Sequence, residues 1–410
     1  MTLLRKVNIQ ASDSPSIDAF ARLRVSNPQT LFDSKQIFDN APLFWDDQEE
    51  SGSGTSSTYN ANQASSTIAV GDATAGKRTR QTLMRFNYQP GKSQLIFMTF
   101  SLNGEGGAGI TKTIGYGDDN NGIFLKDNEG TKQIVTRTYS SGTAVDNAVD
   151  QSLWNIDKMD GSGASGITLD FSKTQILIID FEWLGVGRVR IGFVIDGIPV
   201  YCHQFLNANN LGLVYMSTPN LPLRYQIEND GTGAAADLDH ICASVISEGG
   251  VQDNGVLRYH STAGTHINAN IADTIYAVVG IRLKSSHIGS VVKVATLTML
   301  NATTDDYEWL LILNPTLAVA TAWTNQVNSS VQTTIGNAGN PSTSTVTGGT
   351  QMLGGLVKSS GAAGSFTLEI SNALLLGSAI DGTPDEIFLC VRPYAAGADI
   401  DGGITYRELS

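Results

Sequence analysis

The chain has 410 residues, of which 16% are charged and 43 are glycine, and its 39 acidic residues against 26 basic residues give a formal net charge of −13. A hydrophobic fraction of 41% suffices for a core and excludes wholesale disorder, while the negative charge argues against a surface for nucleic acid. The three cysteines are far apart, so neither a disulfide framework nor a zinc site is predicted, and no apolar run is long enough for a membrane span.

Residues 1–40 are predicted to form an extended arm. Their apolar residues come singly, at spacings that fit neither a helix nor a long strand, and two prolines interrupt them. Such a segment cannot bury its own surface, so we expect it to lie on a neighbouring surface, in the same subunit or in another. The candidates for contact with another subunit are Phe20, Leu23, Val25, Leu31 and Phe32. The start of the chain lacks the apolar core of a signal peptide, which predicts synthesis in a cytoplasm without export by a cleaved signal.

Residues 41–249 are predicted to form a β-sandwich domain. Strands are expected at 94–102, 174–183, 189–195 and 198–205. Alternation in the second of these places Leu177, Ile179, Phe181 and Trp183 on one face. Asp196-Gly197 lies between two apolar runs and predicts a two-residue hairpin. The small polar residues of 51–67 predict either a linker or a long hairpin.

Gly249-Gly250 marks a predicted boundary, after which residues 250–410 form a second, smaller β-sandwich domain. The expected strands are 274–284, 291–300, 307–314, 364–370, 386–393 and a terminal strand at 402–409. Helical periodicity is nearly absent from the chain. The predicted fold class is therefore all-β: two jelly-roll or concanavalin-like β-sandwich domains with an extended N-terminal arm.

The strongest enzymatic signal is the acidic pair Asp180 and Glu182. Acids at alternate positions of a strand point to one face, and sandwich glycosidases place three of them in that way. Ile178 stands where the first acid, the nucleophile, would be needed. We therefore predict a strand with a polar outer edge and no enzymatic activity.

Two acidic loops could bind Ca²⁺ through their oxygen atoms. Asp118 and Asp119 precede Asn-Asn-Gly, and Asp399 and Asp401 precede Gly-Gly. Neither loop has the ligand spacing of an EF-hand, and Asx-rich turns cap their own backbone. A turn without a metal ion is predicted for both.

The histidines and cysteines suggest no metal site. Cys202 and His203 are adjacent and so point to opposite faces of a strand, whereas His240 and Cys242 could share a face. Two side chains alone do not make a site, and of the five histidines only His260 and His266 lie close together in sequence. We predict no catalytic residue, no cofactor and no metal.

The arm contains a run that resembles a signature found at the N-terminus of many virion proteins of tailed phages. In those proteins Asp-Ala-Phe-Gly-Arg-Leu-Arg-Val-Ser-x-Pro is followed by Thr-Leu-Phe-Asp-Ser-Lys. Here the run spans 16–35, with Ala21 in place of the usual glycine. Segments 42–47, 84–92, 181–190 and 404–409 also resemble sequence motifs of the same group of proteins.

The resemblance implies a structural protein located in the virion, made in the cytoplasm of the bacterial host. The first expectation is a minor capsid, decoration or head-fibre protein that forms a homo-oligomer through its arm and contacts the major capsid protein or virion proteins near the tail and portal. The second is a tail, collar or baseplate protein that binds a host surface glycan. Two further alternatives are a glycan-active enzyme using Asp180 and Glu182, and an adhesin for carbohydrate or calcium with Asp118, Asp119 and Tyr116 at its rim.

Overall fold

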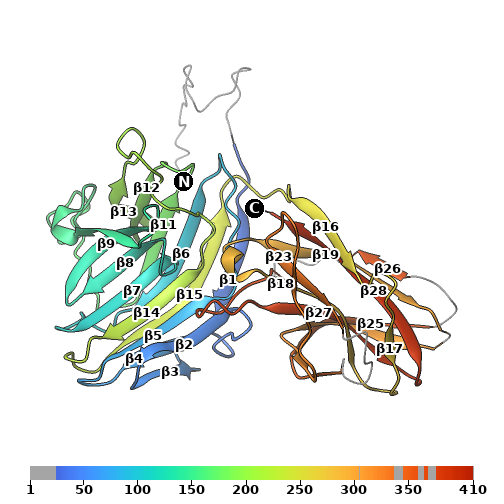
Figure 1. Ribbon diagram of the computed structural model, residues 1–410. Coiled ribbons are helices and arrows are strands. Elements are labelled where there is room, and N and C mark those ends of the chain that lie inside the picture. Colours follow the sequence, from blue (N-terminus) through green and yellow to red (C-terminus); the bar gives the residue numbers. More distant parts are fainter. Residues whose placement is uncertain (1–24, 304, 337–344, 359–363, 368–374, 410) are drawn as a thin grey trace, which may run out of the picture.

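The computed structural model describes residues 25–303, 305–336, 345–358, 364–367 and 375–409. Within these ranges the chain consists of antiparallel strands and two short 3₁₀ helices, Gln151–Leu153 and Ser285–His287. The predicted all-β class is therefore confirmed. Figure 1 shows strands β1 to β15 gathered in one body and strands β16 to β28 in another.

The first body is a sandwich of two sheets. The eight-stranded sheet has the order β13-β12-β11-β6-β15-β4-β3, with β1 beside β15, and the seven-stranded sheet has the order β10-β9-β8-β7-β14-β5-β2. The bounds are β1 (Gln29–Lys35), β2 (Trp45–Gly52), β3 (Thr55–Asn60), β4 (Ser65–Val70), β5 (Gly76–Thr82), β6 (Gln94–Ser101), β7 (Ile110–Gly117), β8 (Gly122–Asn128), β9 (Thr131–Thr138), β10 (Val145–Asp150), β11 (Gln175–Phe181), β12 (Val189–Ile195), β13 (Ile198–Phe205), β14 (Leu223–Asn229) and β15 (Ala236–Ser247).

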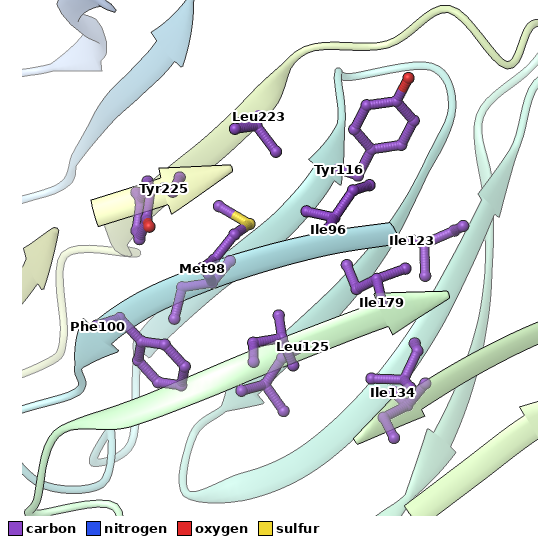
Figure 2. Packing of buried hydrophobic residues seen from close by; sticks show 14 of the residues in the cluster. Ile96, Met98, Phe100, Tyr116, Ile123, Leu125, Ile134, Ile179, Leu223 and Tyr225 are labelled. Atoms are coloured by element: carbon purple, nitrogen blue, oxygen red, sulfur yellow. The ribbon is translucent and has the colours of Figure 1, made fainter. Parts of the chain in front are cut away.

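The core of this body lies between the two sheets. Alternate residues of β6 are buried, whereas β7 and β11 are buried on both faces. Leu177, Ile179 and Phe181 of β11 are almost fully buried, as predicted, whereas Trp183 follows the end of the strand and is only partly buried. Figure 2 shows side chains of β6 and β11, such as Met98, packed against those of the opposite sheet.

Two hairpins in this body correspond to turn and loop predictions made from the sequence. Asp196 and Gly197 join β12 to β13 with φ angles of 50° and 79°. Positive φ at both positions is the type I′ geometry that the Asp-Gly sequence predicts. The polar stretch 51–67 contains β3 and most of the hairpin that pairs it with β4, so it is a hairpin and not a linker.

The second body also packs sheet on sheet. A five-stranded sheet has the order β16-β28-β19-β26 with β17 beside β28, a six-stranded sheet has the order β22-β23-β18-β27-β20-β25, and β21 pairs with β24. The bounds are β16 (Val256–Ser261), β17 (Ile267–Ala269), β18 (Tyr276–Leu283), β19 (Val292–Asn301), β20 (Tyr307–Leu313), β21 (Thr316–Leu317), β22 (Thr324–Asn325), β23 (Val331–Ile335), β24 (Val346–Thr347), β25 (Thr350–Val357), β26 (Gly364–Thr367), β27 (Glu386–Pro393) and β28 (Ala398–Glu408).

The chain passes from one body to the other between Ser247 and Val256. This passage is held to the first body, because the Lys92 ammonium donates a hydrogen bond of 3.0 Å to the backbone carbonyl of Gly250. The predicted domain limits, 41–249 and 250–410, stay a prediction, and the change of body falls across their common boundary.

A second connection joins the bodies through the loop that follows residue 374. The backbone N–H of Ser378 donates to the carbonyl of Leu83 at 2.9 Å. The buried guanidinium of Arg85 donates to Ser378 Oγ at 2.8 Å. These bonds attach a loop of the second body to the segment that follows β5.

Candidate functional site

Strand β1 lies within residues 25–40, the described part of the predicted arm, and it joins the eight-stranded sheet. It pairs with β15 so that Phe32 lies opposite Val245, and the Phe32 side chain points into the sandwich. Phe32 is 6% exposed, and its ring centroid lies 5.2 Å from that of Phe86, 5.9 Å from Phe44 and 6.1 Å from Trp45. This part of the arm therefore packs on its own chain.

The five candidate contact residues of the arm differ in their position and exposure. Phe20 and Leu23 lie outside the described residues. Val25 is 87% exposed, and Leu31 is partly buried against the core. Phe32 is enclosed by its own chain, so its burial needs no second subunit. A contact with another subunit stays a prediction for the remaining residues.

Exposed apolar side chains surround the end of β1. Ile37, Phe38 and Leu43 are 52%, 87% and 46% exposed, and they line a cavity of about 440 Å³ beside the strand. Among the described strands, β15 is the one partner of β1, so the outer edge of β1 is open. We call this edge and these three side chains the arm-base surface. Open edges and exposed apolar clusters are features that assemblies commonly cover.

A buried polar cluster fixes the arm-base surface from beneath. The fully buried guanidinium of Arg80 donates from Nη1 to Asp47 Oδ2 at 2.6 Å. From Nη2 it donates to the carbonyl of Asn40 at 2.7 Å and to Gln36 Oε1 at 3.4 Å. Gln36 and Asn40 flank Ile37 and Phe38, so one arginine holds both ends of the exposed apolar segment.

His240 lies in the same cluster and is fully buried. Its ring stacks on Tyr225 with centroids 4.1 Å apart, and the Trp45 centroid lies 4.2 Å away. Nδ1 of His240 accepts a hydrogen bond of 3.4 Å from Arg80 Nε. Burial, together with the charge of Arg80, holds the pKa of His240 well below its ordinary value. The imidazole is therefore neutral at pH 7.

The two residues of the predicted acidic pair, Asp180 and Glu182, have different partners and different exposure. Asp180 is buried on β11, where it forms an ion pair with Arg190 and accepts a hydrogen bond of 3.1 Å from the Tyr201 hydroxyl. Burial, with the Asp180 charge, raises the pKa of Tyr201 to about 12. Glu182 lies beyond the end of β11, is exposed, and accepts the backbone N–H of Arg188 at 3.2 Å. The period-2 argument fails at Glu182 because the strand has already ended.

The loop after β7 uses its carboxylates within the protein. Asp118 Oδ1 accepts the backbone N–H of Asn121 at 3.0 Å, which is the Asx geometry of a turn. Asp119 Oδ1 lies 2.5 Å from Arg224 Nη1. Tyr116 is fully buried in the core, so its expected place at a binding rim was wrong.

The histidine and cysteine side chains of the two predicted pairs make separate contacts. Cys202 is buried, and the adjacent His203 accepts a backbone N–H at Nδ1. A β-bulge lies between His240 and Cys242, and Cys242 Sγ lies 3.2 Å from Thr99 Oγ1 while His240 points into the core. The expectation that these two could share a face was wrong, because the bulge reverses the alternation.

The described ranges contain neither a metal-binding cluster nor a membrane-spanning helix. They hold no group of three or more His, Cys, Asp or Glu side chains placed to bind a metal ion. They also contain no helix with the length and apolar character that crossing a membrane requires.

A second cavity, which the sequence analysis did not single out, lies over the outer face of the five-stranded sheet. Its volume is about 420 Å³, and its lining includes an aromatic ring, hydroxyl groups and a carboxylate. Its lining includes Tyr259, Thr262, Thr298, Leu300 and Asp401. They come from β16, the loop after it, β19 and β28, so strand pairing alone brings them together.

Comparison with known proteins gave no family. No family model matches the chain, and no curated protein matches it. Solved structures with weak similarity include the carbohydrate recognition domain of Emp47p, with a TM-score of 0.35, 10% identity, and coverage of 54% of this chain and 97% of that one. The CBM2 module of the evolved Dit of Lactobacillus casei BL23 phage J-1 has a TM-score of 0.36 and 6% identity, covering 56% of this chain and 100% of the module.

A third structure of this kind is arcelin-5, a lectin-like defence protein of Phaseolus vulgaris. Its TM-score is 0.33 and its identity 9%, with coverage of 55% of this chain and 100% of arcelin-5. All three TM-scores are low.

Proposed function

We propose that the chain is a structural component of a tailed-phage virion and that it assembles with copies of itself through its N-terminal arm. The observation that supports this is the position of the run resembling virion proteins. The second half of that run is β1, an edge strand with an open outer edge beside exposed apolar side chains. A strand or an apolar segment of a neighbouring copy can pair with or cover such an edge.

The size of the arm-base surface is consistent with a contact between subunits. Ile37, Phe38 and Leu43 together expose nearly two full side chains of apolar surface. Covering them would contribute about 3 to 5 kcal/mol per subunit before the entropic cost of association. That gain is modest, so further arm residues must add to it in a stable assembly.

One substitution separates assembly from folding. Phe38→Asp places a charge on the arm-base surface, and we expect it to weaken self-association by at least about tenfold, because a buried unpaired carboxylate is unfavourable. Leu153→Asp is the matched control, since Leu153 is 68% exposed and lies outside this surface. Light scattering coupled to size-exclusion chromatography measures the effect. Equal behaviour of both variants would contradict the role of the arm base.

The place of the chain in the particle follows from the same proposal. We favour a minor capsid, decoration or head-fibre protein in contact with the major capsid protein, and the net charge of −13 suits a position away from the packaged genome. A tail, collar or baseplate position is the alternative. A reconstruction of the particle distinguishes them, because copies at capsid lattice axes support decoration and copies on the tail axis support the alternative. Absence of the chain from purified virions would refute both.

We propose no catalytic role. Asp180 pairs with Arg190 and Tyr201, and Glu182 accepts the backbone N–H of Arg188, so both carboxylates already have partners within the protein. The enzyme alternative is tested by incubating the protein with bacterial capsule or laminarin-type glucans and measuring new reducing ends. Activity that disappears in Glu182→Gln would overturn this conclusion.

A carbohydrate-binding role in host adhesion is the second candidate function. The cavity beside Tyr259 and Asp401 supports it, because its lining combines an exposed aromatic ring with hydroxyl groups and one carboxylate. Binding of surface polysaccharides from a bacterial host to the full chain tests this role.

A further inference from the structure

Tyr259 of β16 is a rigidly backed aromatic ring that remains open to solvent. It is 59% exposed, and its hydroxyl lies 3.3 Å from Thr298 Oγ1. The ring rests on Gly403 of β28, where a Cβ atom would lie 2.4 Å from Tyr259 Oη and 2.6 Å from its ring carbons. The absence of a side chain at Gly403 is therefore what allows the ring to lie against the sheet.

Asp401 presents a carboxylate on the same face of β28, two residues before Gly403. Its Oδ1 accepts a hydrogen bond of 2.7 Å from Thr262 Oγ1, and its Oδ2 lies 2.7 Å from His266 Nδ1. These two contacts orient the carboxylate. An ionised carboxylate has about four acceptor positions, so Asp401 can accept further hydrogen bonds from a ligand.

The cavity between these groups has the size and chemistry of a site for a small neutral ligand. Its volume of about 420 Å³ falls in the usual range for ligand pockets, about 300–1,000 Å³. Thr298 supplies a hydroxyl group, and Leu300, which is 41% exposed, supplies an apolar wall, while the buried Thr262 serves to orient Asp401. None of the described residues that line it is Lys or Arg. A phosphorylated or strongly anionic ligand would therefore meet Asp401 without a compensating cation.

We propose that this cavity is a carbohydrate-binding site for a neutral sugar. The C–H bonds on one face of a pyranose carry partial positive charge and stack on the negative face of the Tyr259 ring. The hydroxyl groups at the edge of the sugar donate to Asp401, in hydrogen bonds that the carboxylate charge strengthens. This inference rests on the carbohydrate-binding candidate above and is independent of assembly through the arm.

The test begins with the full chain on an array of bacterial surface polysaccharides, with glucose, galactose, N-acetylglucosamine and rhamnose as soluble probes. Saturation-transfer NMR identifies which sugar protons approach the protein, and titration calorimetry gives affinities. We expect transfer to be strongest for C–H protons on one face of the ring. Competition by a free monosaccharide separates sugar binding from a contact with another virion protein.

Four variants test the site itself. Tyr259→Ala and Asp401→Asn should each weaken binding by at least about tenfold, whereas Tyr259→Phe keeps the ring and should retain most of the affinity. Gly403→Ala should weaken binding without touching the sugar, because the new methyl group displaces the ring from the sheet. Tyr394→Ala is the matched control, since Tyr394 is 49% exposed and lies outside the cavity. Circular dichroism and thermal unfolding verify that each variant is folded.

The possible results are distinguishable. Loss of binding in Tyr259→Ala and Asp401→Asn, with the control unchanged, supports the site. Sugar binding that persists in both variants overturns this site and leaves the carbohydrate-binding function standing. If neither polysaccharides nor monosaccharides bind the folded wild-type chain, the site and the carbohydrate-binding function are both overturned, while the proposal of assembly through the arm is unaffected.

Discussion

Replacing Phe32 by alanine tests whether the described part of the arm belongs to the fold of its own chain. Its ring is 6% exposed and lies within 5.2 to 6.1 Å of three aromatic rings, measured between centroids. In a site enclosed in this way, Phe→Ala removes buried surface and leaves a cavity, at a cost of about 3 to 5 kcal/mol. The same substitution at Phe38, which is 87% exposed, should change stability by no more than about 0.5 kcal/mol.

The assay is urea denaturation of the full chain at low protein concentration, followed by tryptophan fluorescence. Trp45 packs against Phe32 and reports on the first sandwich. We expect Phe32→Ala to move the midpoint of that transition to lower urea, with no shift for Phe38→Ala. A cost below about 1 kcal/mol for Phe32→Ala would refute the reasoning, since a buried phenylalanine cannot be removed so cheaply. A cost that varies with protein concentration would show that β1 is exchanged between subunits.

The remaining predictions concern the arm, a buried histidine and a turn. Removal of residues 1–24 spares β1 and should leave stability unchanged while abolishing incorporation into particles. Removal of residues 1–35 should in addition destabilise the first sandwich, and equal stability of the two truncated chains, measured by thermal unfolding, would contradict the placement of β1. Because the pKa of His240 is lower in the folded state than in the unfolded state, its contribution to stability is present above about pH 6.5 and is lost as the pH falls, by up to about 1.4 kcal/mol per pH unit. His240→Gln should therefore reduce the acid dependence of unfolding between about pH 6.5 and 5. Gly197→Ala should cost about 1 to 2 kcal/mol in denaturant unfolding, because φ is 79° and no atom lies near the added methyl group; a cost near zero would mean that the turn relaxes.

Local patterns were sufficient to predict ten strands, those with clear apolar runs, which is fewer than half of the strands that the structure describes. The alternation of Leu177, Ile179 and Phe181 identifies β11 because a half-buried strand repeats every two residues. The hairpin at Asp196-Gly197 was equally accessible, since its backbone geometry depends on two adjacent residues. Both features depend only on residues that are close in sequence, so both could be predicted from the sequence.

The role of Phe32 could not be predicted in the same way. It belongs to a short apolar pair, Leu31-Phe32, in a segment without periodicity, and its burial depends on β15, far along the chain. The cavity beside Tyr259 also depends on residues distant in sequence, because Gly403 approaches the Tyr259 ring only after β16 pairs with β28. Glu182 illustrates the opposite error: a local period was extended one residue beyond the strand that produced it.

The loop that joins the two bodies has a mechanical consequence. Besides its bonds to Leu83 and Arg85, this loop donates the backbone N–H of Ile380 to Asp46 Oδ2 at 2.7 Å. A force that acts between the arm and the outer face of β28 would therefore be transmitted by these hydrogen bonds as well as by the covalent chain. These bonds would restrict rotation of one body relative to the other, so that a displacement of the arm would also move the second body.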